Sequence, residues 1–138
     1  MRVVIVGCSR LGARLAAVMD SEGHSVTVID LDSSAFRRLP DSYSGATVIG
    51  TGIDEDILLS AGIDHADIFI AATNGDNRNI MAAQMAKQAF GVKQVLCRIY
   101  DPVRAEKYHS LGIETICPTT RVADMFLSAI TMEAAGSN

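Results

Sequence analysis

The chain has 138 residues, of which 49% are hydrophobic and 20% are charged, and its formal net charge is −4. This length and composition predict a single soluble α/β domain, and the acidic balance excludes a surface that binds nucleic acid or anionic lipid through bulk charge. No apolar run reaches the roughly 20 residues that cross a bilayer, and the N-terminus lacks a signal-peptide pattern, so we expect a cytoplasmic protein without direct membrane insertion.

The first predicted strand, residues 2–6, is a continuous apolar run that leads into a turn bounded by Gly7 and Gly12. An alanine- and leucine-rich helical pattern follows over residues 13–19. A buried parallel strand that feeds a helix has this pattern. Because the N-terminus of a helix has unpaired N–H groups and partial positive charge, we expect a phosphate group to bind at this turn.

Strands and helices alternate along the rest of the chain. The further expected strands are residues 26–30, 47–49, 66–72, 94–99 and 114–117, and the further expected helices are residues 33–39, 55–61, 79–90, 103–110 and 119–134. This spacing is typical of parallel βαβ units and predicts a Rossmann-like, doubly wound sheet of six strands in the order 3-2-1-4-5-6. We expect residues 1–118 to form this domain and residues 119–138 to form a C-terminal helix and tail.

In such a fold the ligand lies at the carboxyl ends of the strands, where the strand order reverses. Asp30 ends the second strand 18 residues beyond Gly12, close to the position of the acid that binds the adenosine ribose. Its negative charge favours NAD, or another nucleotide with an unphosphorylated ribose, over NADP. Ser9 replaces the middle glycine of the usual turn, where its hydroxyl would either crowd a phosphate or donate a hydrogen bond to it.

Two arginines are candidate phosphate ligands. Arg10 lies in the turn, where its guanidinium would contact phosphate oxygens unless it is simply solvated. Arg98 ends an otherwise apolar strand, where an unpaired charge is costly to bury. It therefore needs an anionic partner, which is either a bound phosphate or one of Asp76 and Asp101.

The remaining polar residues are less specific. Asn74 faces the expected crevice, whereas Asp76 and Asn77 are better explained as helix-capping residues. Cys8, Cys97 and Cys117 form no C-x-x-C pair and are expected to be reduced. For Cys8, packing under the turn is favoured over a redox role.

No catalytic or metal-ligating cluster is evident, and His24, His65 and His109 are poorly placed for acid–base work, so we expect binding without catalysis. The alternative is an NAD-dependent reductase completed by a partner or a missing domain.

Several short motifs in this order resemble the N-terminal domain of regulators of potassium conductance, the TrkA-N or RCK family. They are Gly7-Cys8-Ser9-Arg10-Leu11-Gly12, Val28-Ile29-Asp30, Leu59-Ser60-Ala61-Gly62-Ile63, Ala72-Thr73-Asn74-Gly75-Asp76-Asn77, Arg98-Ile99-Tyr100-Asp101-Pro102 and Leu111-Gly112-Ile113. The resemblance implies a cytoplasmic regulatory subunit that binds NAD(H) or ATP/ADP, acts on a membrane potassium transporter or channel, and forms dimers or rings of dimers.

The expected nucleotide site contains the residues at the strand ends and in the loops after them. They are Gly7, Ser9, Arg10, Leu11, Gly12, Asp30, Leu31, Thr51, Gly52, Thr73, Asn74 and Arg98. The last helix has a wide apolar face that includes Val122, Met125, Phe126, Ala129, Ile130 and Met132. We expect this face to pack on another subunit. The alternative is that it covers the edge of the sheet.

Overall fold

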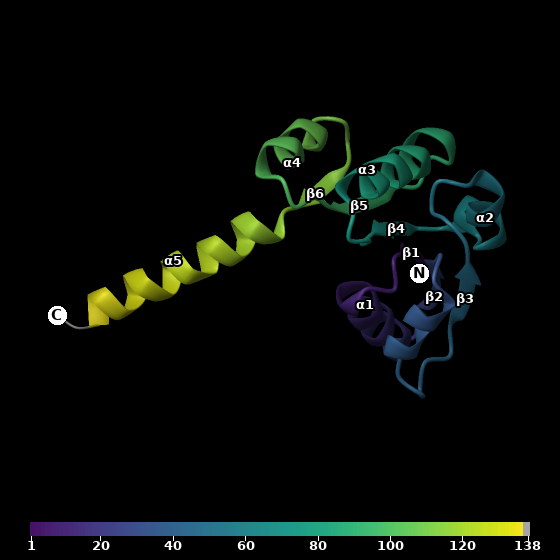
Figure 1. The fold of residues 1–138 in the computed structure, drawn as a ribbon, viewed down its shortest axis with the longest axis horizontal. Helices are drawn as coiled ribbons and strands as arrows, with labels where there is room; N and C mark the ends of the chain where they lie inside the picture. The colour runs from purple at the N-terminus through teal and green to yellow at the C-terminus, as the bar shows by residue number, and fades with distance from the viewer. Residues whose placement is uncertain (137–138) are drawn as a thin grey trace.

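The computed structural model describes residues 1–136, which form one parallel sheet with helices on both faces (Figure 1). The strands are β1 (Arg2–Val6), β2 (Ser25–Asp30), β3 (Ala46–Ile49), β4 (Ile68–Ala71), β5 (Gln94–Arg98) and β6 (Glu114–Ile116). The helices are α1 (Arg10–Ser21), η1 (Ser33–Arg38), α2 (Glu55–Ser60), η2 (Ile63–His65), α3 (Asp76–Gln84), η3 (Met85–Ala89), α4 (Pro102–His109) and α5 (Pro118–Gly136).

The six strands lie in the order β3-β2-β1-β4-β5-β6, and all neighbours are parallel. The predicted fold class and strand order are therefore confirmed. Alternate residues of the central strands point to opposite faces, as the pleat requires. Val3 and Ile5 pack with α1 and η1, whereas Val4 and Val6 belong to the larger cluster beneath α2, α3 and α4. Both faces of β1 and β4 are therefore buried, which explains their unbroken apolar sequences.

Several predicted boundaries differ from the structure. α1 begins at Arg10, so Gly12 lies inside the helix and the loop before it is shorter than the predicted turn. α3 begins at Asp76 instead of residue 79, with Gly75 as its N-cap. The expected capping role of Asp76 and Asn77 is wrong, because both residues lie in the first helical turn. Asp32 and Asp54 cap the helices that follow them, η1 and α2.

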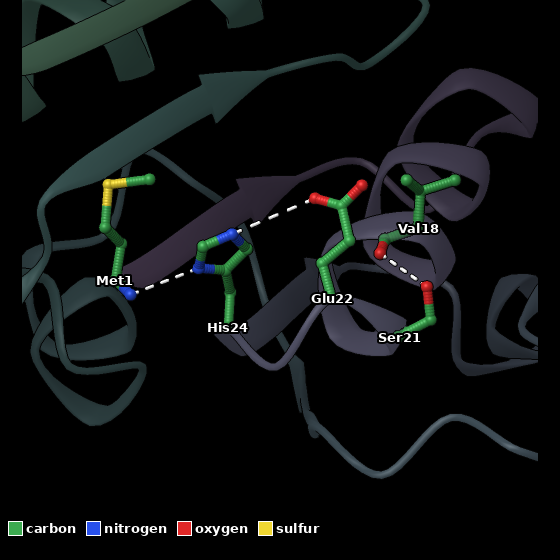
Figure 2. A network of polar contacts seen from close by, with 5 residues as sticks. All are labelled: Met1, Val18, Ser21, Glu22 and His24. Atoms are coloured by element: carbon green, nitrogen blue, oxygen red, sulfur yellow. Dashed lines mark hydrogen bonds and ion pairs between the residues drawn. The ribbon is translucent and has the colours of Figure 1, made fainter.

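The amino edge of the sheet has a small polar network of its own (Figure 2). The Met1 ammonium group lies 3.1 Å from His24 Nδ1, and the other ring nitrogen of His24 lies 3.9 Å from a Glu22 carboxylate oxygen. The Ser21 hydroxyl donates to the Val18 carbonyl in the last turn of α1. His24 therefore joins the start of β1 to the loop before β2, at the end of the sheet opposite the carboxyl edge.

Helix α5 extends away from the body of the domain (Figure 1). Every residue from Thr119 to Met132 is exposed, including Phe126 at 67% and Met125 at 70%. The alternative that this helix covers the sheet edge is therefore wrong. Among residues 1–136, no helix combines the length and the apolarity that a membrane span requires.

Candidate functional site

A cavity of about 600 Å³ opens at the carboxyl edge of the sheet. It lies where the chain turns from β1 toward β2 on one side and from β4 toward β5 on the other. Eleven of the twelve residues assigned to the site from sequence line this cavity, and Gly12 is the exception. The volume lies within the range of small-molecule and cofactor sites, and the position matches the crevice that ligands occupy in doubly wound sheets.

Gly7 forms the turn that opens the cavity. Its φ of +103° is in the region that side chains rarely adopt, and an added Cβ would lie 2.7 Å from the Thr73 nitrogen. The close approach of this turn to the end of β4 therefore requires glycine. Gly12 has a different role, because its absent Cβ would lie 1.9 Å from the Gly7 carbonyl oxygen. Gly12 permits close packing of α1 against the turn and does not line the cavity.

The N–H groups of Ser9, Arg10 and Leu11 form no hydrogen bond within residues 1–136. All three residues line the cavity at the positive end of the α1 dipole. The next two N–H groups are occupied, because Gly12 donates to the Ser9 hydroxyl and Ala13 donates to the Ser9 carbonyl. This arrangement provides three backbone donors for an anionic group, which is the basis of phosphate binding at helix N-termini.

The Ser9 side chain faces the protein. Its hydroxyl accepts from the Gly12 N–H at 3.1 Å and donates its proton to the Ala72 carbonyl at 2.8 Å. Ser9 is therefore the N-cap of α1 and also ties the turn to the end of β4. In this arrangement the hydroxyl has no second proton to donate to a phosphate, and only the backbone N–H of Ser9 is available.

Asp30 is held between two loops. One carboxylate oxygen accepts from the Cys8 N–H and the other from the Asp32 N–H, both at 2.8 Å. Because an ionised carboxylate offers about four acceptor positions, Asp30 retains capacity for ribose hydroxyls. Cys8 itself is fully buried in the core, which confirms the packing interpretation. Burial, and secondarily the Asp30 carboxylate, raise the pKa of the Cys8 thiol, with Arg38 opposing, so the redox alternative loses its physical basis.

Four arginines line the cavity, against the carboxylates of Asp30 and Asp32. They are Arg10, Arg38, Arg78 and Arg98. The Arg38 guanidinium donates to the Cys8 carbonyl at 3.0 Å, which holds it beside the phosphate-binding turn. The site is therefore locally basic in a chain whose net charge is −4. Sequence reasoning missed Arg38 and Arg78, although each closely follows a strand end, at the end of η1 and in the first turn of α3.

Arg98 is bound by oxygens that carry no formal charge. Its Nη2 atom donates to the Ala72 carbonyl at 3.0 Å, the Thr73 carbonyl at 2.8 Å and the Asn74 side-chain oxygen at 3.2 Å. The buried Nε has no partner within residues 1–136. The alternative that Asp76 or Asp101 pairs with Arg98 is wrong, because these carboxylates accept backbone N–H groups instead. The charge of Arg98 thus has no carboxylate partner in the described part of the chain.

Asn79 holds the wall of the site together and was missed from sequence. It is the one polar side chain that is fully buried among residues 1–132, whose side-chain burial the structure describes. Its side-chain oxygen accepts from the N–H and the hydroxyl of Thr73, and its amide nitrogen donates to the carbonyls of Thr73 and Arg98. Asn79 therefore fixes the ends of β4 and β5 relative to each other.

This constellation can be compared with known proteins. The sequence profile of the TrkA-N domain matches residues 3–118. The chain belongs to the TrkA-N domain family. A TrkA-N relative from Streptomyces coelicolor, the Trk system potassium uptake protein TrkA, is 49% identical over 127 residues. That match covers 92% of this chain and 57% of the relative, so the chain spans little more than half of it.

Solved structures share the TrkA-N fold. The TrkA-N domain of the inner membrane protein ybaL from Escherichia coli superposes with a TM-score of 0.82 at 16% identity, covering 93% of this chain and 95% of that one. The GsuK structure bound to ADP gives a TM-score of 0.76 at 22% identity, covering 91% of this chain and 32% of that one. The GsuK channel bound to NAD gives a TM-score of 0.71 at 19% identity, covering 88% of this chain and 22% of that one.

Proposed function

We propose that this chain is a nucleotide-binding regulatory domain of a potassium uptake system, and that its ligand is NAD(H) or ATP/ADP. The three unpaired N–H groups at the start of α1 carry the proposal, because they provide a phosphate site at the edge where Asp30 can bind a ribose. The basic cavity supports the same ligand class. A GsuK structure with ADP and another with NAD have this fold, which keeps both nucleotide classes in the proposal.

In the proposed complex, the N–H groups of Ser9, Arg10 and Leu11 bind phosphate oxygens and Asp30 accepts from the ribose. Arg10 and Arg98, which both line the cavity, supply positive charge. The cavity also contains Gly7, Leu31, Thr51, Gly52, Thr73 and Asn74, which complete the proposed site. Gly12 supports it indirectly by allowing α1 to approach the turn.

The proposed partners follow from the relatives and from α5. The Streptomyces coelicolor relative is named as a potassium uptake protein, so we assign this chain to a cytoplasmic position beside a membrane potassium transporter or channel. The exposed apolar side chains of α5 are proposed to contact a second copy of the chain, which makes a dimer the basic unit. Residues 1–118 then form the nucleotide-binding part, and residues 119–138 form the C-terminal helix that makes the contact and a tail, of which 137–138 lie outside the described residues.

We propose regulation and not catalysis as the use of the nucleotide. A ligand that binds two arrangements of a dimer with different affinities shifts the equilibrium between them and hence the state of an attached transporter. Addition of NADH to the protein with candidate carbonyl substrates should therefore give no loss of nicotinamide absorbance. A substrate-dependent loss would establish a reductase instead.

Titration calorimetry with NAD, NADH, ATP, ADP and AMP tests the proposed function. We expect saturable binding of at least one of these nucleotides. Asp30→Ala should lose at least tenfold in affinity, about 1.4 kcal/mol, because it removes the carboxylate that accepts hydrogen bonds from the ribose. Ser33→Ala is the matched control, because Ser33 is an exposed neighbour outside the cavity. Absence of binding by all five nucleotides at millimolar concentration would refute the proposal.

A further inference from the structure

Two side chains at the base of α5 donate to the same backbone carbonyl of the domain. The Thr119 hydroxyl, in the first turn of α5, and the Cys117 thiol, just before it, both lie 3.4 Å from the Tyr100 carbonyl oxygen and donate to it. The Thr120 hydroxyl lies 3.5 Å from the same Cys117 sulfur. Beyond this turn, residues up to Met132 are exposed and form no hydrogen bond to the rest of the described chain.

Tyr100 also forms part of the nucleotide cavity. Tyr100 lines the cavity and is 39% exposed, and the centroid of its ring lies 5.0 Å from the Arg98 guanidinium carbon. Its N–H donates to Asp76 at 2.8 Å, which connects it to the first turn of α3. The ring, the N–H and the carbonyl of this one residue therefore contact the cavity, α3 and the base of α5, respectively.

The Arg98 contact is suited to respond to an anion. A guanidinium over an exposed aromatic ring is held weakly, whereas charge-assisted hydrogen bonds from arginine to phosphate are among the strong ones. A phosphate beside Arg98 would therefore compete with the Tyr100 ring for the guanidinium, whose Nη2 stays bonded to the Ala72 and Thr73 carbonyls, and would change the packing of the ring.

We propose that Tyr100 is a positioning residue that couples nucleotide occupancy to the orientation of α5. This inference rests on the proposed nucleotide site, and it adds the contact through which that site reaches the helix. An anion at Arg98 changes the position of the Tyr100 ring, the ring shifts the carbonyl, and the carbonyl changes the attachment of Cys117 and Thr119. Nucleotides that place a phosphate beside Arg98 then alter α5, and a nucleoside without phosphate does not.

Hydrogen exchange of the full chain, read in peptides covering residues 117–126, tests this coupling. Each measurement is made with and without the nucleotide that binds most tightly in calorimetry, and with adenosine. We expect nucleotide to change the exchange rate at least fivefold in the wild type and in Tyr100→Phe, which keeps the ring and the peptide group. In Tyr100→Leu and Thr119→Val the change should fall below twofold.

Thr131→Val is the matched control for Thr119→Val, because the Thr131 hydroxyl bonds only within α5, to the Leu127 carbonyl. It should retain the full response. Calorimetry on Thr119→Val, whose side chain is outside the cavity, separates loss of coupling from loss of binding. Nucleotide binding without an exchange response in the wild type, or an undiminished response in Thr119→Val, would overturn the coupling alone. Failure of every nucleotide to bind would overturn the proposed function and, with it, this inference.

Discussion

Replacement of Asn79 by alanine tests how the wall of the cavity is built. The variant removes four hydrogen bonds, of 2.6 to 3.0 Å, from a side chain with no exposed surface. The Thr73 carbonyl keeps its bond from Arg98, and the Thr73 hydroxyl keeps a longer bond to the Gly75 carbonyl. The Thr73 N–H and the Arg98 carbonyl, however, lose their main partner.

A buried polar group without a partner costs about 1–3 kcal/mol, so two such groups predict a loss of about 2–6 kcal/mol in the free energy of unfolding. This is a large part of the stability of an ordinary domain. Urea denaturation measures the loss, and it is followed by circular dichroism because the sequence contains no tryptophan for a fluorescence signal. Nucleotide affinity should fall as well, because Thr73 and Arg98 lose their fixed positions.

Asn77→Ala is the control for Asn79→Ala. Asn77 is exposed two residues earlier in the same helix and contacts only the Arg104 side chain. Its removal should change the unfolding free energy by less than about 1 kcal/mol. If Asn79→Ala lost less than 1 kcal/mol, or no more than Asn77→Ala, the conclusion that Asn79 holds β4 and β5 together would be refuted.

Three further predictions concern packing, pH and assembly. Gly12→Ala should lower the free energy of unfolding by more than about 3 kcal/mol in urea titrations, because the added Cβ would overlap the Gly7 carbonyl. Gly23→Ala is the control: the space around Gly23 is open but its φ is +91°, so the free energy of unfolding should fall by about 1–2 kcal/mol. Burial raises the pKa of the Cys97 thiol to about 12 and also raises the pKa of the Tyr43 hydroxyl. The stability that these two protonated groups contribute is therefore complete below pH 9 and is lost as the pH rises toward 12. Equal urea midpoints at pH 8 and pH 11 would contradict this prediction. Phe126→Asp should convert a dimer to a monomer in light scattering, while Asp124→Asn on the same helix leaves the mass unchanged, and a wild-type monomer would contradict the assigned role of α5.

The sheet and the cavity edge could be predicted from sequence because they depend on local patterns. An apolar run that ends at Gly7 indicated β1, a nearly all-apolar run over residues 66–72 indicated β4, and Asp30 followed from its distance to the turn. The orientation of the Ser9 hydroxyl toward the protein could not be predicted, because its acceptor, the Ala72 carbonyl, is 63 residues away in the sequence. Arg98 was recognised as unusual, but its partners were not, since backbone carbonyls leave no trace in residue types. Asn79 was missed because a single asparagine in a helical pattern gives no sign of burial.

The length of α5 has a mechanical consequence. A helix of 19 residues is about 28 Å long at 1.5 Å per residue. Because the helix begins at Pro118 and its side chains are exposed as far as Met132, a change at Tyr100 that rotated its base would swing the whole helix. A rotation of about 10° at the base would carry the far end through roughly 5 Å, about the pitch of one helical turn. A small rotation at the base of α5 would therefore move its far end by a distance on which helices change their packing partners.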